Sequence, residues 1–239
     1  MVHRWLNNIL SGSLTRNCQL CGSVEITGDI DLCPDCYKDL PWLPAACPRC
    51  ATPVPSMPVS NDMLCGQCQQ NSPAFDNSQA LFHYESPLDY LIQGLKFHGQ
   101  LSHANLLGKL MARHFVKTAH KVDCLIPVPL HPKRLRERGF NQALELARPI
   151  AKQLNIKIDT QRCQRVRHTD GQADLSLAKR HANVRNAFSV CTNVDWDHVV
   201  IIDDVMTSGQ TVNTLAKALK HSGVNKVSVW SCCRATTNK

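Results

Sequence analysis

The chain has 239 residues, of which 43% are hydrophobic and 5% aromatic, and it carries a formal charge of +8. The hydrophobic fraction is sufficient for a packed core and excludes wholesale disorder, and no apolar run approaches the roughly 18 residues that a membrane-spanning helix needs. This length suits one medium domain with a small appendage, or two small domains.

Residues 1–10 are expected to form a short amphipathic helix rather than a secretory signal, because no small-residue cleavage signature follows their apolar patch. A chain that is not exported keeps its cysteines as reduced thiols or metal ligands. We therefore expect a cytoplasmic protein whose 13 cysteines do not form a disulfide framework.

Eight of the cysteines form four Cys-x-x-Cys pairs in a proline-rich segment. The pairs are Cys18/Cys21, Cys33/Cys36, Cys47/Cys50 and Cys65/Cys68. Two such pairs complete a tetrahedral zinc site, and coordination by four sulfurs leaves no position for water, so two structural zinc ions are predicted. Sequential pairing is favoured because each site then closes a short loop, while a cross-braced arrangement stays open. Four redox dithiols are the alternative.

Near residue 75 the cysteine- and proline-rich segment gives way to long stretches with periodic apolar residues. This change divides a zinc-ribbon domain (1–75) from a second domain (76–239). In the second domain, apolar spacing predicts helices over 86–97, 104–118, 141–154 and 210–222, and buried strands over 122–127, 198–203 and 226–232. Such alternation is typical of an α/β fold with a mostly parallel sheet, whose ligands bind at the carboxyl ends of the strands. Most of the five remaining cysteines are expected to be buried.

The strand predicted over 198–203 leads into the most informative residues of the chain. Asp203 and Asp204 are followed by a turn with hydroxyl groups and Gly209, and then by a helix. Adjacent carboxylates can accept hydrogen bonds from a vicinal diol, and a helix N-terminus with free N–H groups suits a phosphate. This combination predicts a ribose 5-phosphate site. The alternative is an acidic pair that only binds magnesium or caps the helix.

The stretch from Val199 to Thr211 resembles the phosphoribosyl-pyrophosphate (PRPP) signature of type I phosphoribosyltransferases. The chain from about Cys18 to Arg234 resembles the ComF/GntX family, which is linked to DNA uptake and utilisation. Further resemblance lies in Leu95–Phe97, Ile126–Leu130, Arg138–Gln142 and the run Gln172, Leu175, Arg180, Asn183, Ala187 and Phe188. The resemblance implies a sheet of the type I phosphoribosyltransferase kind, preceded by a double zinc ribbon.

The resemblance also implies roles for individual residues. Asp203 and Asp204 would hold the ribose hydroxyls as the catalytic pair. The rest of the PRPP-binding segment would be Val205, Met206, Thr207, Ser208, Gly209, Gln210 and Thr211. The loop after Ile126 would face the pyrophosphate.

Positive charge is concentrated in two segments, 131–138 and 161–185, which supply most of the net charge and are expected to be loops. Basic groups beside the ribose site would neutralise a pyrophosphate leaving group. The residues expected on the pyrophosphate side are Val128, Pro129, Arg134, Arg138 and Arg180. The alternatives are a solvated basic surface and a grip on nucleic acid, for which Trp196, Trp230, Phe140 and Phe188 are the candidate stacking residues.

These features predict a PRPP-binding, phosphoribosyltransferase-like protein of the ComF type, which acts in DNA uptake or in the use of DNA-derived nucleotides. Its ligands would be PRPP with magnesium or a related phosphorylated ribose, and its partners single-stranded DNA and DNA-uptake proteins. The alternative function is an active nucleobase phosphoribosyltransferase of nucleotide salvage. A third hypothesis is a zinc-stapled interaction module.

Overall fold

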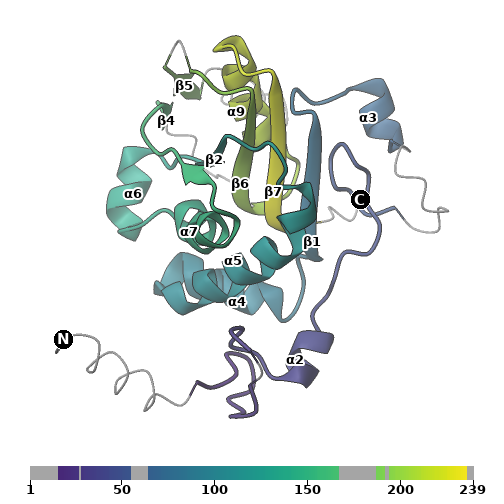
Figure 1. Ribbon diagram of the computed structural model, residues 1–239, viewed down its shortest axis with the longest axis vertical. Helices are drawn as coiled ribbons and strands as arrows, with labels where there is room; N and C mark the ends of the chain where they lie inside the picture. The colour runs from purple at the N-terminus through teal and green to yellow at the C-terminus, as the bar shows by residue number, and fades with distance from the viewer. Residues whose placement is uncertain (1–15, 27, 55–63, 167–186, 192–193, 236–239) are drawn as a thin grey trace, which may run out of the picture. The chain divides into compact units, whose positions relative to one another are not determined.

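The computed structural model describes residues 16–26, 28–54, 64–166, 187–191 and 194–235 (Figure 1). The helix expected over 1–10 lies outside these ranges. The chain forms two compact units, residues 1–40 and residues 41–239. The boundary predicted near residue 75 follows composition and stays a prediction about domains, whereas the compact units separate after Leu40. The last four cysteines of the proline-rich segment therefore belong to the unit that contains the sheet.

Unit 1 is small and its described part contains one short helix, α2 (Pro34–Lys38). Its buried apolar side chains are Cys18, Ile30, Leu32, Cys33 and Leu40. The backbone N–H of Gln19 donates to the carbonyl of Asp31 at 2.9 Å, and Arg16 pairs with the Asp31 carboxylate at 2.5 Å. So few core residues are consistent with a unit that relies on metal ligation to fold.

Unit 2 contains a five-stranded sheet in the order β1-β7-β6-β2-β3, and every strand pair is parallel (Figure 1). The strands are β1 (Asn77–His83), β2 (Cys124–Pro127), β3 (Lys157–Ile158), β6 (His198–Met206) and β7 (Lys226–Arg234). A separate antiparallel pair joins β4 (Cys163–Arg165) to β5 (Phe188–Val190). The predicted α/β class with a mostly parallel sheet is confirmed.

Helices cover both faces of this sheet. They are α4 (Leu88–His98), α5 (Leu101–Phe115), α7 (Gln142–Leu154) and α9 (Gln210–His221), with shorter helices α3 (Gly66–Gln70), η1 (Val116–Thr118) and α6 (Pro132–Arg138). On one face, Phe115 of α5 stacks on Trp230 of β7 with ring centroids 4.9 Å apart. On the other face, Leu215 of α9 packs in one cluster with Val199 and Ile201 of β6. Side chains along a strand alternate between the two faces of the sheet, so successive side chains of β6 pack against helices on opposite faces.

Helices α5 and α7 approach each other closely at Gly108. A Cβ atom at this position would lie 2.2 Å from Cγ of Pro149 and 2.6 Å from the carbonyl oxygen of Leu146. Only glycine leaves room for the two helix backbones at this distance. None of the helices within the described ranges is long and apolar enough to cross a membrane.

Three sequence expectations for unit 2 were wrong or incomplete. Residues 131–138 form helix α6 rather than a loop, beginning at Pro132 and ending at Gly139, whose φ is 81°. Strand β6 continues past Asp203 to Met206, because β7 pairs with it as far as Arg234. Strand β1 was not expected, since its buried residues follow no clean alternation. Cys124, Cys163, Cys232 and Cys233 are buried as expected, and Cys191 is exposed.

Candidate functional site

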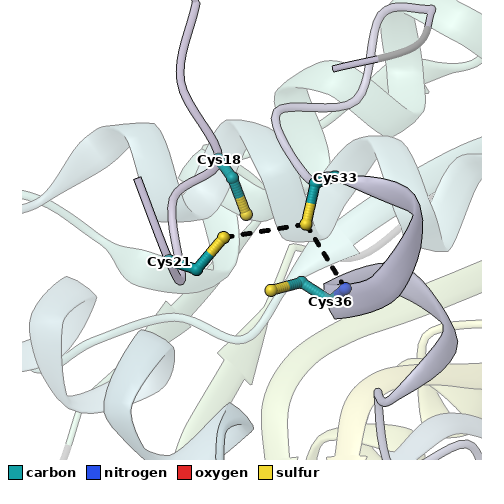
Figure 2. A group of neighbouring side chains, drawn as sticks. All are labelled: Cys18, Cys21, Cys33 and Cys36. Atoms are coloured by element: carbon teal, nitrogen blue, oxygen red, sulfur yellow. Dashed lines mark hydrogen bonds between the residues drawn. The ribbon is translucent and has the colours of Figure 1, made fainter. Parts of the chain in front are cut away.

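The eight paired cysteines form two clusters, one in each unit. Cys18, Cys21, Cys33 and Cys36 make the first cluster, and Cys47, Cys50, Cys65 and Cys68 make the second, with the sulfur atoms of each cluster within 4.8 Å of one another. Figure 2 shows the four side chains of the first cluster converging, with Cys33 and Cys36 at the start of α2. The favoured sequential pairing is confirmed.

The geometry of both clusters fits a zinc ion. Four sulfurs at about 2.3 Å from a central ion lie about 3.8 Å apart. Cys21 Sγ lies 3.7 Å from Cys33 Sγ, and Cys50 Sγ lies 3.5 Å from Cys65 Sγ. Burial disfavours the charged form of Cys18, but the N–H groups of Cys21, Cys33 and Leu20 outweigh it and lower the pKa of this thiol to about 6. The arrangement is that of two structural four-cysteine zinc sites with no open coordination position.

The topology of the sheet places a switch point between β2 and β6, where parallel sheets form a ligand-binding crevice. From β2 the chain proceeds outward to β3, whereas from β6 it proceeds in the other direction to β7. At such a switch point the loops after two adjacent strands diverge and leave room for a ligand at their carboxyl ends. The residues beside the end of β2 are Pro127 and Val128 on one side and Asp203 and Asp204 of β6 on the other, shortly before β6 ends at Met206.

The two aspartates lie on opposite faces of β6. Asp203 has the same parity as Ile201 and so faces the layer of α9, whereas Asp204 faces the layer of α4. Asp204 is buried, and its Oδ2 lies 2.7 Å from Nζ of Lys96, at the end of α4. Carboxylate oxygens of the pair also accept the backbone N–H groups of Asp204 and Val205 at 3.0 and 2.8 Å. The local backbone and Lys96 therefore hold the pair in place.

Burial and the neighbouring Asp204 carboxylate raise the pKa of Asp203 to about 8, against the opposing effect of Lys96. A perturbed carboxylate at the end of a strand, in a crevice, is a feature of functional sites rather than of solvated surfaces. Without a ligand to donate hydrogen bonds, this carboxyl group holds a proton near neutral pH.

Arginines surround the pair. Burial lowers the pKa of Arg138 while the charge of Asp204 raises it, and burial lowers the pKa of Arg165 while the charge of Asp203 raises it. Arg134, exposed on α6, is close enough to lower the pKa of both arginines. Arg138, Arg165 and Lys96 therefore interact with the two carboxylates, and Arg134 adds a positive charge beside the two arginines, so this end of the sheet favours an anion.

The loop after β2 is held by α7. Val128 is buried, its N–H donates to the carbonyl of Ile202 at 3.0 Å, and its own carbonyl accepts Nδ2 of Asn141 at 3.1 Å. Oδ1 of Asn141 caps α7 by accepting the N–H groups of Ala143 and Leu144. Arg138 donates to Oε1 of Gln142 at 2.5 Å. Pro129 lies half-buried in this loop, and Arg180 lies outside the described residues.

The expected phosphate-binding turn connects β6 to α9. Thr207 and Ser208 are exposed, and Gly209 is the N-cap of α9 in the left-handed region, with φ of 72°. The N-cap residue Gly209 has no side chain to cap this helix, Ser208 Oγ accepts the N–H of Gln210 at 3.4 Å, and the positive end of the helix dipole faces the turn. Val205 lies in the strand and Met206 is buried beneath Gly209. Their side chains belong to the sheet and core rather than to the turn surface.

A cavity of about 840 Å³ extends from this turn along α9. Its lining includes Ser208, Gly209 and Gln210 at one end, Lys217 and His221 at the other, and Cys50 and Cys68 of the second cluster. None of the described residues that line it is acidic. The cavity is therefore a polar groove with basic groups beside the second cysteine cluster.

Sequence reasoning missed several features of the site. Lys96 lies in a segment with family resemblance, but only the fold brings its ammonium group to Asp204. Arg165 was included only in the positive charge of segment 161–185 and was not predicted to lie near Asp203. Two expected stacking residues are unsuited to that role, because Trp230 and Phe188 are buried in the core. Of the other two, Trp196 is half-buried under the guanidinium of Arg162, and Phe140 is half-buried.

Comparisons with known proteins match two parts of the chain to domain families. A double zinc ribbon domain matches residues 9–69, and a phosphoribosyl transferase domain matches residues 141–238. DNA utilization protein YhgH of Salmonella typhi is 33% identical over 224 residues, which cover 91% of this chain and 96% of that protein. Competence protein F of Haemophilus influenzae is 33% identical over 85% of this chain and 90% of its own length. Competence protein ComFC of Bacillus subtilis is 24% identical over 82% and 80%.

Proposed function

This chain belongs to the ComF/YhgH family, and we propose on that premise that unit 2 binds PRPP, or a related phosphorylated ribose, in the cytoplasmic handling of DNA or DNA-derived nucleotides. One observation carries the proposal. The carboxylates of Asp203 and Asp204 lie at the switch point of the sheet, near the end of β6 and before the turn that leads into the N-terminus of α9. An acidic pair for a diol and an anion site for a phosphate are thus within one β-to-α connection.

Each part of the ligand has a partner in this arrangement. The ribose hydroxyls would donate to Asp203 and Asp204, and the 5-phosphate would accept from Thr207, Ser208 and the first N–H groups of α9. Lys96, Arg134 and Arg138 supply positive charge on the side where pyrophosphate would lie. Magnesium bound with PRPP would neutralise further charge on the pyrophosphate oxygens.

The raised pKa of Asp203 gives this binding a pH signature. Hydroxyl donors and magnesium favour the ionised carboxylate, so binding near pH 7 would release a proton from Asp203. The enthalpy of binding should then depend on the ionisation enthalpy of the buffer. Above pH 8 the proton is already lost, and the buffer dependence should disappear.

Calorimetry with PRPP and magnesium tests the site. The native chain should bind, and Asp203→Asn/Asp204→Asn should lower the affinity at least about 100-fold, because two charge-assisted hydrogen-bond acceptors are lost. Glu85→Gln is the matched control, since it removes an exposed carboxylate of unit 2 outside the crevice. Equal affinity in the native and doubly substituted chains would remove the site assignment.

The proposal has two forms, which differ in whether the protein consumes the PRPP that it binds. A binding-only protein would retain PRPP unchanged, whereas a nucleobase phosphoribosyltransferase of nucleotide salvage would release pyrophosphate when the correct base is added. A screen of PRPP consumption against nucleobases distinguishes them. Loss of activity in Asp203→Asn/Asp204→Asn would show that any turnover comes from this site.

A second candidate activity is the binding of single-stranded DNA, which the relatives' names and the basic groove along α9 favour together. Polyanions bind such surfaces through phosphate contacts and release counterions, so log K should fall with log[salt]. Filter binding at two salt concentrations should give a negative slope, and Lys217→Gln should reduce it by about 0.7, the value for one phosphate contact of a single strand. A slope of zero would exclude the groove as a binding site for single-stranded DNA. DNA-uptake proteins would then be the remaining proposed partners.

A further inference from the structure

Arg234, the last residue of β7, connects the second cysteine cluster to the phosphate-binding turn. Its Nε donates to the carbonyl of Cys50 at 3.2 Å, and its Nη2 donates to Oγ1 of Thr52 at 3.0 Å. Its Nη1 donates to the carbonyls of Met206, at 2.9 Å, and Thr207. One guanidinium group thus bonds both the segment that carries a zinc ligand and the segment that begins the turn.

We propose that the second zinc site controls the conformation of the phosphate-binding turn through Arg234, so that phosphate binding requires metal at this site and not at the first. Arg234 is in this view a positioning residue, which acts through its bonds to the turn although it also lines the cavity beside it. The consequence for PRPP rests on the proposed function above. The conformational part of the inference does not depend on it.

The cysteine end of this connection depends on metal ligation. Sγ of Cys50 lies 3.1 Å from Oγ1 of Thr52, the same oxygen that accepts Nη2 of Arg234. The tight turn at this end is closed by the N–H of Cys47, which donates to the carbonyl of Thr52 at 2.9 Å, and by the N–H of Ala51, which donates to the carbonyl of Cys47 at 2.8 Å. A bound ion holds all four sulfurs together, and without it this turn loses its main constraint.

Charge also links Arg234 to the metal. A zinc ion with four thiolates carries a net charge of −2, which favours a half-buried guanidinium beside it.

The turn end has few other constraints. Thr207 and Ser208 are exposed, Gly209 sits in the left-handed region, and the N–H of Gln210 donates to Ser208 Oγ at 3.4 Å within the turn itself. The carbonyls of Met206 and Thr207 that accept from Arg234 directly precede these residues. Fixing these two peptide groups orients the chain as it enters the turn, and therefore aligns the N–H groups that would receive a phosphate.

The first cysteine cluster is the internal control. It lies in unit 1, where its neighbouring bonds, such as Gln19 N–H to the Asp31 carbonyl, join residues of the same unit. Cys18→Ser/Cys21→Ser should remove one zinc ion without changing the turn. Cys65→Ser/Cys68→Ser should also remove one zinc ion, and these two residues make none of the bonds to Arg234 described above.

The test is amide hydrogen exchange of residues 207–211 in the full chain, with zinc content measured for each variant. Exchange of these amides should accelerate at least about tenfold in the second-site variant and stay unchanged in the first-site variant. Arg234→Lys should keep both zinc ions and still accelerate this exchange, because a single ammonium group cannot bond both segments as the planar guanidinium does. Arg234→Lys decides the question if the second-site variant unfolds.

Equal exchange in both cysteine variants would overturn the inference, and so would native exchange in Arg234→Lys. PRPP affinity, measured by calorimetry, should fall about tenfold in Arg234→Lys. If the native chain binds no PRPP while the exchange pattern is as expected, the proposed function fails and the coupling stands. If PRPP binds native and Arg234→Lys chains equally, the coupling to ligand binding fails and the site remains.

Discussion

The two cysteine clusters have the same ligands and nearly the same geometry, but they lie in different surroundings. The first belongs to a unit of about 40 residues with few buried apolar side chains. The second belongs to the unit that contains the sheet, where Ser78 of β1 donates to the carbonyl of Arg49 at 2.9 Å and Arg234 bonds Cys50. An identical metal site can therefore hold a small unit together in one place and fasten part of a large domain in another.

The largest difference is expected when zinc ligands are removed. Cys47→Ser/Cys50→Ser should lower the midpoint of thermal unfolding of unit 2 by roughly 10 °C or more, because a structural zinc site contributes several kcal/mol and each kcal/mol shifts a domain of this size by about 2–4 °C. Cys18→Ser/Cys21→Ser should leave that transition unchanged. Tryptophan fluorescence follows it, since Trp230 lies in the core of unit 2. Equal shifts of the unfolding midpoint in the two double variants would show that the two clusters do not differ in their contribution to unit 2.

The next effect tests whether the second cluster shares the cooperative unfolding of the sheet. Gly108→Ala forces α5 away from α7, at a cost of about 1–3 kcal/mol, which predicts a midpoint roughly 2–12 °C lower. The temperature at which the second site releases zinc to a chelator should fall by the same amount as this midpoint. The release temperature of the first site should not change. Gly66→Ala in α3 is the control, since a Cβ there meets nothing within 4 Å. Release at an unchanged temperature would mean that the second cluster unfolds separately.

A smaller effect is expected at the acidic pair. Asp203 has its pKa raised to about 8 in the fold, so its contribution to stability is full below the unfolded value near 4 and is lost as the pH rises through 8. Asp203→Asn does not titrate and should therefore unfold several °C above the native chain at pH 8, with the gap closing toward pH 4. Scanning calorimetry of both chains measures this. A gap that widens toward acid would show that the pKa is lowered instead.

The smallest effect concerns the surface of unit 1. Arg16→Ala removes an ion pair to Asp31 whose arginine side chain is 44% exposed, and such pairs contribute about 0–1 kcal/mol. Chelator competition should show slightly faster zinc loss from the first site, by less than about fivefold, and no change at the second. An effect on the second site would mean that the two units are coupled.

The spacing of residue types was sufficient to predict the helices and strands that depend on interactions between residues close in sequence. Asn141 caps α7, Gly223 follows α9, and the four-apolar run before Asp203 forms a buried strand, as their residue types indicate. The cysteine pairing followed from loop length. Strand β1 could not be predicted because its burial comes from β7 on one edge and Trp42, which bridges to Phe82, on the other. The extension of β6 to Met206 likewise depends on the length of its partner.

The sequence by itself determined the types of site: two sets of thiolates, an acidic pair after a strand, and a hydroxyl-rich turn before a helix. These depend on chemical identity and short spacing, which the chain carries wherever it folds. Only the tertiary structure decided the assembly, because Lys96 reaches Asp204 across 108 positions of sequence and Arg234 reaches Cys50 across 184. Contacts of this range depend on how helices and strands pack, and packing is a property of the whole fold rather than of any segment.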